Sequence, residues 1–112
     1  MKNIHILPTD KPSRLHTYFE RLDYLKLSNE ALNWREAKNI YITSDEEIKE
    51  RDWFLTDDKR VEKSTPDWNA RDWHKKIILT TDQDLIKDGV QAIDDEFLEW
   101  FVKNPSCEWV EL

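Results

Sequence analysis

The hydrophobic and polar positions of this chain follow one pattern that occurs twice. Residues 40–48 and 77–85 both begin with aliphatic or aromatic residues, pass through two hydroxyl residues and an aspartate, and close on an aliphatic residue. Runs of β-branched and aromatic residues favour strands. We therefore expect two similar buried strands that end in acidic turns and pack side by side in one core, as a scaffold without chemistry of its own.

Three further segments have strand patterns. Ile4-His5-Ile6 alternates apolar and polar residues, and Pro8 and Pro12 then interrupt any regular element. Trp53–Leu55 and Arg60–Lys63 flank the turn 57–59. The last two segments together predict a β-hairpin, although the turn between them lacks the glycine that would strengthen this prediction.

The clearest helix pattern covers Asp94 to Pro105. Acidic residues occupy its first turn, Lys103 lies in its last turn, and Asn104-Pro105 ends it, in the order that the helix dipole favours. Phe97, Trp100 and Phe101 fall on one face, which we expect to dock on the sheet. We therefore expect Trp100 to lie in the core.

Other segments give weaker patterns. Ser13–Leu27 predicts an irregular or helical turn followed by a short strand, and 28–37 predicts two helical turns. Ser44 and Glu47 form a capping-box pattern that predicts a short helix through Ile48. The remaining expectations are a turn at 82–84, a positive φ at Gly89, the only glycine, and a last short strand over 107–112 that ties down the terminus and places Trp109 in the core.

These elements predict one α+β domain over residues 1–112. Its expected architecture is a curled antiparallel or mixed sheet, a partly open barrel, with the C-terminal amphipathic helix packed on it. The chain has 6 Trp, 4 Phe and 3 Tyr and is 38% apolar, so large rings supply much of the core. Disordered chains are poor in such residues.

Charge and cysteine content narrow the functional classes. The formal net charge of −7 argues against direct nucleic-acid binding and suits a solvated surface or a basic protein partner. Cys107 is the only cysteine, which excludes an intrachain disulfide and fits a reducing compartment. No signal peptide or membrane span is visible in the sequence, so we expect a cytoplasmic protein without membrane contact.

No catalytic, metal or cofactor site is predicted. His5, His16 and His74 lack a metal-ligand spacing, and Cys107 beside Trp109 has the pattern of a small buried residue. Helix capping and the helix dipole account for the acidic clusters without general acid–base chemistry. One glycine also excludes a P-loop and a Rossmann fingerprint.

Several tryptophans lie instead in irregular, charged surroundings. Because Trp and Arg often anchor protein interfaces, these positions form the predicted contact surface. They could equally seal a thin core from outside. The predicted partner-binding residues are Trp34, Arg35, Trp53, Trp68, Arg71 and Trp73, and the predicted acidic surface contains Asp45, Glu46, Glu47, Asp57 and Asp58. The stretch from Trp53 to His74 is its expected centre.

Three segments, 39–53, 76–82 and 93–107, resemble a family of small proteins found in phages and prophages of Bacteroidetes. The likeness covers about two thirds of the chain and includes Asp52-Trp53 and the helix sequence DDEFLEWFVKNPSC. Members of that family usually have glycine at the position of Arg51, so a differently built turn is expected here. The Trp-rich stretch 67–74 also departs from the family.

In size, acidity and aromatic content the chain is similar to anti-CRISPR inhibitors. The resemblance implies an inhibitor of a host defence effector, in particular a type VI-B RNA-guided RNA nuclease. Such an inhibitor would bind the basic effector or its RNA complex in the host cytosol and block or distort guide-RNA handling. The alternative is a small phage accessory domain with a structural, nucleic-acid-associated or enzymatic role.

Overall fold

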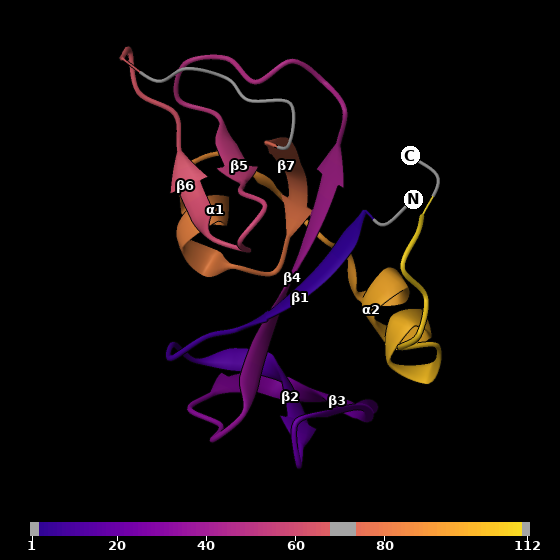
Figure 1. The fold of residues 1–112 in the computed structure, drawn as a ribbon. Coiled ribbons are helices and arrows are strands. Elements are labelled where there is room, and N and C mark those ends of the chain that lie inside the picture. The colour runs from indigo at the N-terminus through magenta and orange to yellow at the C-terminus, as the bar shows by residue number, and fades with distance from the viewer. Residues whose placement is uncertain (1–2, 68–73, 111–112) are drawn as a thin grey trace.

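The architecture is an α+β fold built on one open, mostly antiparallel sheet of eight strands, as the sequence predicts. A computed structural model describes residues 3–67 and 74–110. The long strand β4 (Ala37–Ser44) forms the spine of the sheet, and its residues 37–43 are all buried. Figure 1 shows β2 and β3 at one end of this spine, β5, β6 and β7 at the other, and helix α2 standing to one side.

The two copies of the sequence pattern are neighbours in the sheet. Strand β4 pairs with the antiparallel β7 (Lys75–Thr80), with Tyr41 opposite Thr80 and Ile42 opposite Leu79. This confirms that the copies pack side by side. Because the strands run in opposite directions, the acidic turns that follow them lie at opposite ends of the sheet.

The N-terminal region is more strand-rich than the sequence predicts. Strand β1 (Ile4–Pro8) is confirmed and pairs with β4. Residues 13–32 form the hairpin of β2 (Ser13–Tyr18) and β3 (Arg21–Leu32) in place of the expected irregular or helical turn. The helix predicted over 28–37 is wrong, because β3 runs to Leu32 and a turn at 35–36 leads directly into β4.

The predicted hairpin after Asp52 is confirmed. Strands β5 (Trp53–Leu55) and β6 (Val61–Lys63) pair antiparallel, and β5 continues the sheet beyond β7. Lys59 supplies the left-handed residue of the turn with φ 67°. Thr56 completes it, since its hydroxyl accepts from the Arg60 N–H at 3.0 Å and its own N–H donates to the Arg60 carbonyl at 2.9 Å.

Two helices follow β7. Helix α1 (Gln83–Lys87) replaces the expected turn, with the Asp82 carboxylate accepting from the Asp84 N–H as its N-cap. Gly89 has φ 106°, as predicted, and leads into the short β8 (Gln91–Ala92), which pairs parallel with β7. Helix α2 (Asp95–Lys103) is confirmed, and its Asp94 N-cap accepts from the Phe97 N–H at 2.8 Å.

Two smaller predictions are wrong. The Ser44 hydroxyl accepts from the Glu46 N–H at 3.3 Å instead of forming a capping box with Glu47, and residues 45–48 are not helical. Residues 107–110 form no strand. The C-terminal segment is nevertheless held, because Asn3 exchanges two hydrogen bonds of 2.9 Å with the backbone of Val110. The two ends of the described chain therefore lie together, as Figure 1 also shows.

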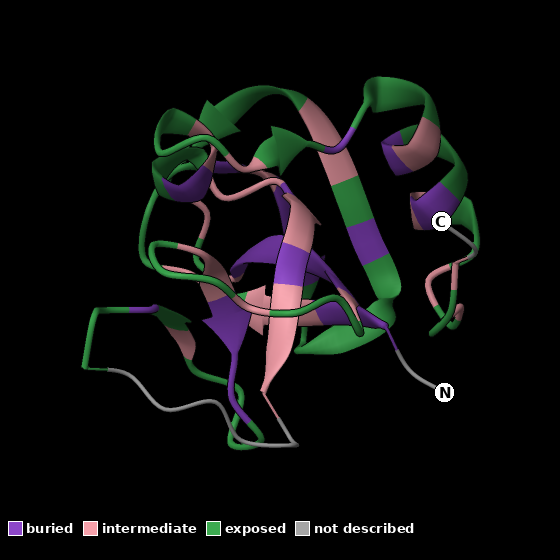
Figure 2. Cartoon of the chain, turned by 90° about the horizontal axis from the view of Figure 1, so that it is seen from above, coloured by how far each residue is buried: buried purple, intermediate pink, exposed green. Residues whose placement is uncertain are grey.

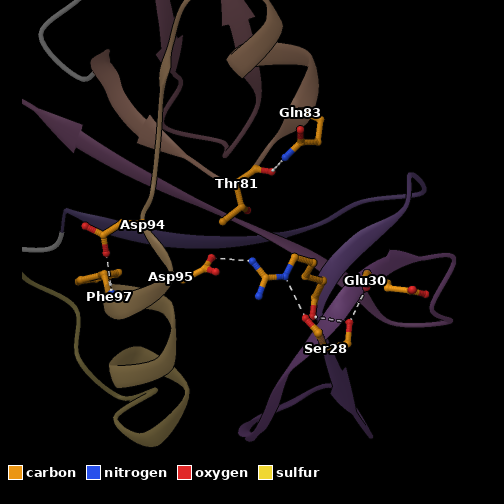
Figure 3. Close-up of polar contacts among 8 residues, drawn as sticks. Ser28, Glu30, Thr81, Gln83, Asp94, Asp95 and Phe97 are labelled. Atoms are coloured by element: carbon orange, nitrogen blue, oxygen red, sulfur yellow. Dashed lines mark hydrogen bonds and ion pairs between the residues drawn. The ribbon is translucent and has the colours of Figure 1, made fainter.

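The main core lies between the sheet and α2. Phe101 is fully buried and Leu98 nearly so, while the outer positions of the helix are exposed (Figure 2). An ion pair of 2.7 Å between Arg14 and Asp95 joins the first turn of α2 to β2, and the Arg14 Nε donates to the Ser28 carbonyl of β3 (Figure 3). The buried members of this core are Ile4, Leu15, Leu25, Ile40, Ile42, Ile93, Leu98 and Phe101.

Candidate partner-binding site

The structure divides the predicted tryptophan surface between two ends of the sheet. Trp34 lies just before the start of β4. Trp53 is on β5, near the end of β4, because Phe54 of β5 and Ser44 of β4 both pair with Lys76 of β7. The eight residues of β4 span roughly 25 Å at about 3.3 Å per residue. Trp34 and Trp53 therefore cannot contribute to one compact contact point.

Trp34 is half-buried against its own chain. Its ring stacks on His16 with centroids 4.0 Å apart, and Tyr18 contacts His16 edge-on with centroids 5.3 Å apart. Burial lowers the pKa of His16, with Glu36 opposing this shift and Lys26 adding to it. Trp34 thus covers the ring of His16 on β2.

Trp53 is half-buried as well and joins two elements. Its indole N–H donates to the Asp88 carboxylate at 2.8 Å, and Lys63 from β6 pairs with the same carboxylate at 2.6 Å. The Lys63 ammonium also lies 5.8 Å from the centre of the Trp53 ring. These contacts tie the β5–β6 hairpin to the end of α1.

The other predicted site residues are scattered. Trp68, Arg71 and Trp73 fall outside the described residues. Arg35 is exposed in the β3–β4 turn, and the predicted acids Asp45, Glu46, Glu47, Asp57 and Asp58 are exposed at the other end of the sheet. Three of these acids have intramolecular partners: Asp45 pairs with Lys75 at 2.7 Å, Asp58 pairs with Arg60 at 3.1 Å, and Glu46 accepts from the Ser44 hydroxyl at 3.1 Å.

The exposed large apolar side chains lie elsewhere in the described chain. Trp100 is 45% and Trp109 48% exposed, so the prediction that both belong to the core is wrong. Trp100 lies at the margin of the helix stripe whose centre is occupied by Phe101, and Trp109 follows α2 in a segment without regular structure. The remaining ones are on the β2–β3 hairpin: Tyr18, Phe19, Leu22, Tyr24 and Leu32.

The turn of the β2–β3 hairpin presents the most exposed of these rings. Phe19 is 80% exposed, and it and Glu20 are the two residues between the paired Tyr18 and Arg21. Their φ angles are 56° and 53°. A two-residue hairpin turn with positive φ at both positions normally contains Asn or Gly, because a Cβ makes this conformation costly. The side chains at this turn are therefore held in unfavourable backbone geometry.

A single carboxylate holds this turn. Glu36, from the β3–β4 turn, accepts from the Phe19 N–H at 3.0 Å, the Glu20 N–H at 2.6 Å and the Thr17 hydroxyl at 2.9 Å. The Glu20 N–H and the other hydrogen bonds to the carboxylate lower the pKa of Glu36. Lys38 pairs with Glu20 at 2.7 Å and adds a second tie. Sequence reasoning missed this arrangement, because Glu36 is distant from the turn along the chain.

A hollowed surface lies beside α2. An open groove of about 580 Å³ has its floor on the sheet at Ile42 and Leu79, and its walls include Phe97, Trp100 and Trp109. The rings of Phe97 and Trp100 are 5.8 Å apart and tilted by 43°. This is the one described place where two exposed tryptophans border the same hollow.

Two observations among the described residues bear on possible chemistry. No group of three or more metal-ligating side chains occurs among residues 3–67 and 74–110. The most perturbed side chain is Tyr41, whose burial and hydrogen bond of 2.6 Å to Asp82 raise its pKa. The Asp82 carboxylate is also the N-cap of α1, so the hydrogen bond between Tyr41 and Asp82 links β4 to the helix and has a structural role.

Comparison with known proteins adds no assignment: no family model, no curated protein and no solved structure matches this chain. Among the described residues, none of the helices is both long and apolar enough to span a bilayer.

Proposed function

We propose that this protein acts by binding a protein partner, as a phage-type inhibitor of a host defence effector. The effector that the sequence resemblance favours is a type VI-B RNA-guided RNA nuclease. Under this proposal the protein works in the host cytoplasm, uses no cofactor, catalyses no reaction, and does not bind nucleic acid or membrane by itself.

The observation that carries the binding role is the exposure of Phe19. Its ring is 80% exposed on a turn whose two central residues have positive φ, and Glu36 holds that turn with two backbone hydrogen bonds. Strained backbone that persists because its surroundings enforce it is typical of functional sites. A rigid, protruding aromatic ring suits an apolar pocket on a partner, where it loses little entropy on binding.

The charge of the chain supports a basic partner. With a net charge of −7, the protein is attracted to a positively charged guide-RNA channel, which increases the association rate at low salt. The aromatic turn would then provide short-range affinity. Inhibition would follow from occlusion or distortion of the channel that holds the guide RNA.

Target-RNA cleavage by the purified effector, loaded with guide RNA, tests this proposal. Increasing wild-type protein should suppress cleavage, and Phe19→Ala should weaken binding by about tenfold or more, as loss of an anchor residue does. Leu32→Ala is the matched control, because Leu32 is an exposed apolar residue at the far end of β3. It should inhibit as wild type does.

Two results would count against the proposal in different ways. Undiminished cleavage at saturating wild-type protein would remove this effector as the partner. Equal inhibition by Phe19→Ala and Leu32→Ala would exclude the hairpin turn as the anchor. Co-purification of host nucleic acid with the protein alone would favour the alternative of a nucleic-acid-associated accessory domain.

A further inference from the structure

The groove beside α2 is distinct from the hairpin turn and combines apolar and acidic features. Its apolar surface comes from four parts of the chain: β4 at Ile42, β7 at Leu79, α2 at Phe97 and Trp100, and the C-terminal segment at Trp109. Aromatic side chains with one face open to solvent are typical of interface cores.

Several carboxylates are close in sequence to the exposed tryptophans. Residues 94–110 contain five acidic residues and one lysine. Asp94 borders the groove itself, Glu96 precedes Trp100 by one helical turn, and Glu108 directly precedes Trp109. The segment that carries both exposed tryptophans is therefore net negative, with Lys103 as its single cation.

Part of this acidity has no role in the fold. Asp94 caps α2 and Asp95 pairs with Arg14, and Glu96 suits the helix dipole in the first turn. Glu99 lies beyond the first turn and Glu108 beyond the helix, so neither has a capping function. Within residues 3–67 and 74–110, no ion pair involves Glu96, Glu99 or Glu108.

We infer that this groove binds a basic amphipathic segment of a partner protein. Large aliphatic or aromatic side chains of that segment would cover Trp100 and Trp109, and its lysines or arginines would meet the surrounding carboxylates. Charge complementarity selects this occupant, because an acidic or neutral apolar segment would leave the carboxylates of the rim without partners. The site is independent of the hairpin turn and of the effector proposed above.

Selection from a displayed library of random dodecapeptides on the immobilised full chain tests this inference. Enriched peptides should combine Arg or Lys with large apolar residues. A synthetic peptide from the selection should bind more weakly as salt increases, since surface charge interactions are screened. Trp100→Ala should reduce its affinity by about tenfold or more, and Glu96→Gln with Glu99→Gln should weaken binding and flatten its salt dependence.

Leu32→Ala is the matched control, because it removes an exposed apolar side chain from the end of β3 and leaves the groove intact. It should bind the peptide as wild type does. Circular dichroism and thermal melting establish that Trp100→Ala remains folded. Either of two outcomes would overturn the inference: no enrichment of basic apolar peptides, or equal binding by Trp100→Ala and wild type. If the protein self-associates with increasing concentration and Trp100→Ala abolishes this, the groove binds a second copy of the chain, and the inference is overturned as well.

Discussion

At the residue scale, left-handed backbone at non-glycine positions distinguishes this chain. Phe19, Glu20, Arg51 and Lys59 all have positive φ, and the only glycine, Gly89, has it too. At Arg51, where members of the phage family that the sequence resembles usually have glycine, φ is 72°. The turn at Arg51 therefore has the backbone conformation that glycine favours.

Replacing Arg51 with glycine should stabilise the protein. Removing the Cβ relieves a left-handed strain of about 1 kcal/mol, partly offset by the greater freedom of glycine in the unfolded chain. Chemical denaturation should show a higher midpoint for Arg51→Gly. Glu50→Gly is the control: Glu50 precedes Arg51 and has no positive φ, so glycine there should lower the midpoint. A lower midpoint for Arg51→Gly would contradict the assigned backbone strain at Arg51.

Glu36→Gln should destabilise the hairpin turn and change its pH dependence. The glutamine amide nitrogen cannot accept a hydrogen bond, so the turn loses one acceptor, and the charge is lost as well. Because the pKa of Glu36 is lowered in the fold, its contribution is complete above its ordinary value of 4.5 and disappears as pH falls through the folded pKa.

Thermal melts across acidic pH measure this effect. Wild type should lose more stability than Glu36→Gln as pH falls below about 4.5, and the two should differ most at neutral pH. Glu30→Gln, at an exposed acid of the same hairpin, should behave as wild type. Parallel pH curves for wild type and Glu36→Gln would contradict the assigned role.

At the element scale, helix α2 formed as predicted because several local signals agree, whereas the helix predicted over residues 28–37 did not form. Helix α2 has an N-cap, an acidic first turn, a basic last turn and an apolar face, and all of these indicate the same structure. Residues 28–37 have helix-compatible composition but no such agreement, and pairing with β2 makes them the end of β3, a turn and the start of β4 instead. Tertiary pairing overrides weak helix propensity.

Asp94→Ala tests the cap of α2. The Asp94 side chain accepts from the Phe97 N–H at 2.8 Å, and its loss should reduce the free energy of unfolding by about 1 kcal/mol. Glu99→Ala, on the exposed part of the same helix, should cost clearly less. The comparison is made by chemical denaturation, and equal losses for the two variants would show that the cap contributes nothing specific.

At the scale of the whole molecule, the two ends of the described chain close the structure. Asn3 is 5% exposed and bonds to Val110 through both ends of its amide, while the backbone N–H groups of Asn3 and Ile4 donate to the Glu108 carbonyl. These contacts hold the segment after α2 against β1. They also fix Trp109, which borders the groove.

Asn3→Ala should release this segment. Two hydrogen bonds disappear and the Val110 backbone groups lose their partners, which should cost about 1–3 kcal/mol. Hydrogen exchange at the Val110 amide should accelerate more than at amides of β4. Asn33→Ala, at an exposed asparagine, is the control and should leave both stability and exchange unchanged. Unchanged exchange at Val110 would contradict the closing role of Asn3.

The sequence by itself determined the elements whose information is local. The repeated apolar pattern predicts β4 and β7, the signals around Asp94 and Asn104 predict α2, and the isolated glycine predicts a left-handed turn. The α+β class with a C-terminal helix on a sheet follows from these elements. Each depends on residues a few positions apart, which a single sequence displays directly.

Only the tertiary structure decided which aromatic residues face solvent. Trp34 and Trp53 have polar neighbours in the sequence but are half-covered by His16 and by Lys63 with Asp88, whereas Trp100 lies on an apolar helix face yet is 45% exposed. Exposure depends on what other elements lie over a side chain, and those elements are distant in sequence. For the same reason, the contact of Glu36 with Phe19 and the groove at Trp100 could be found only in the folded chain.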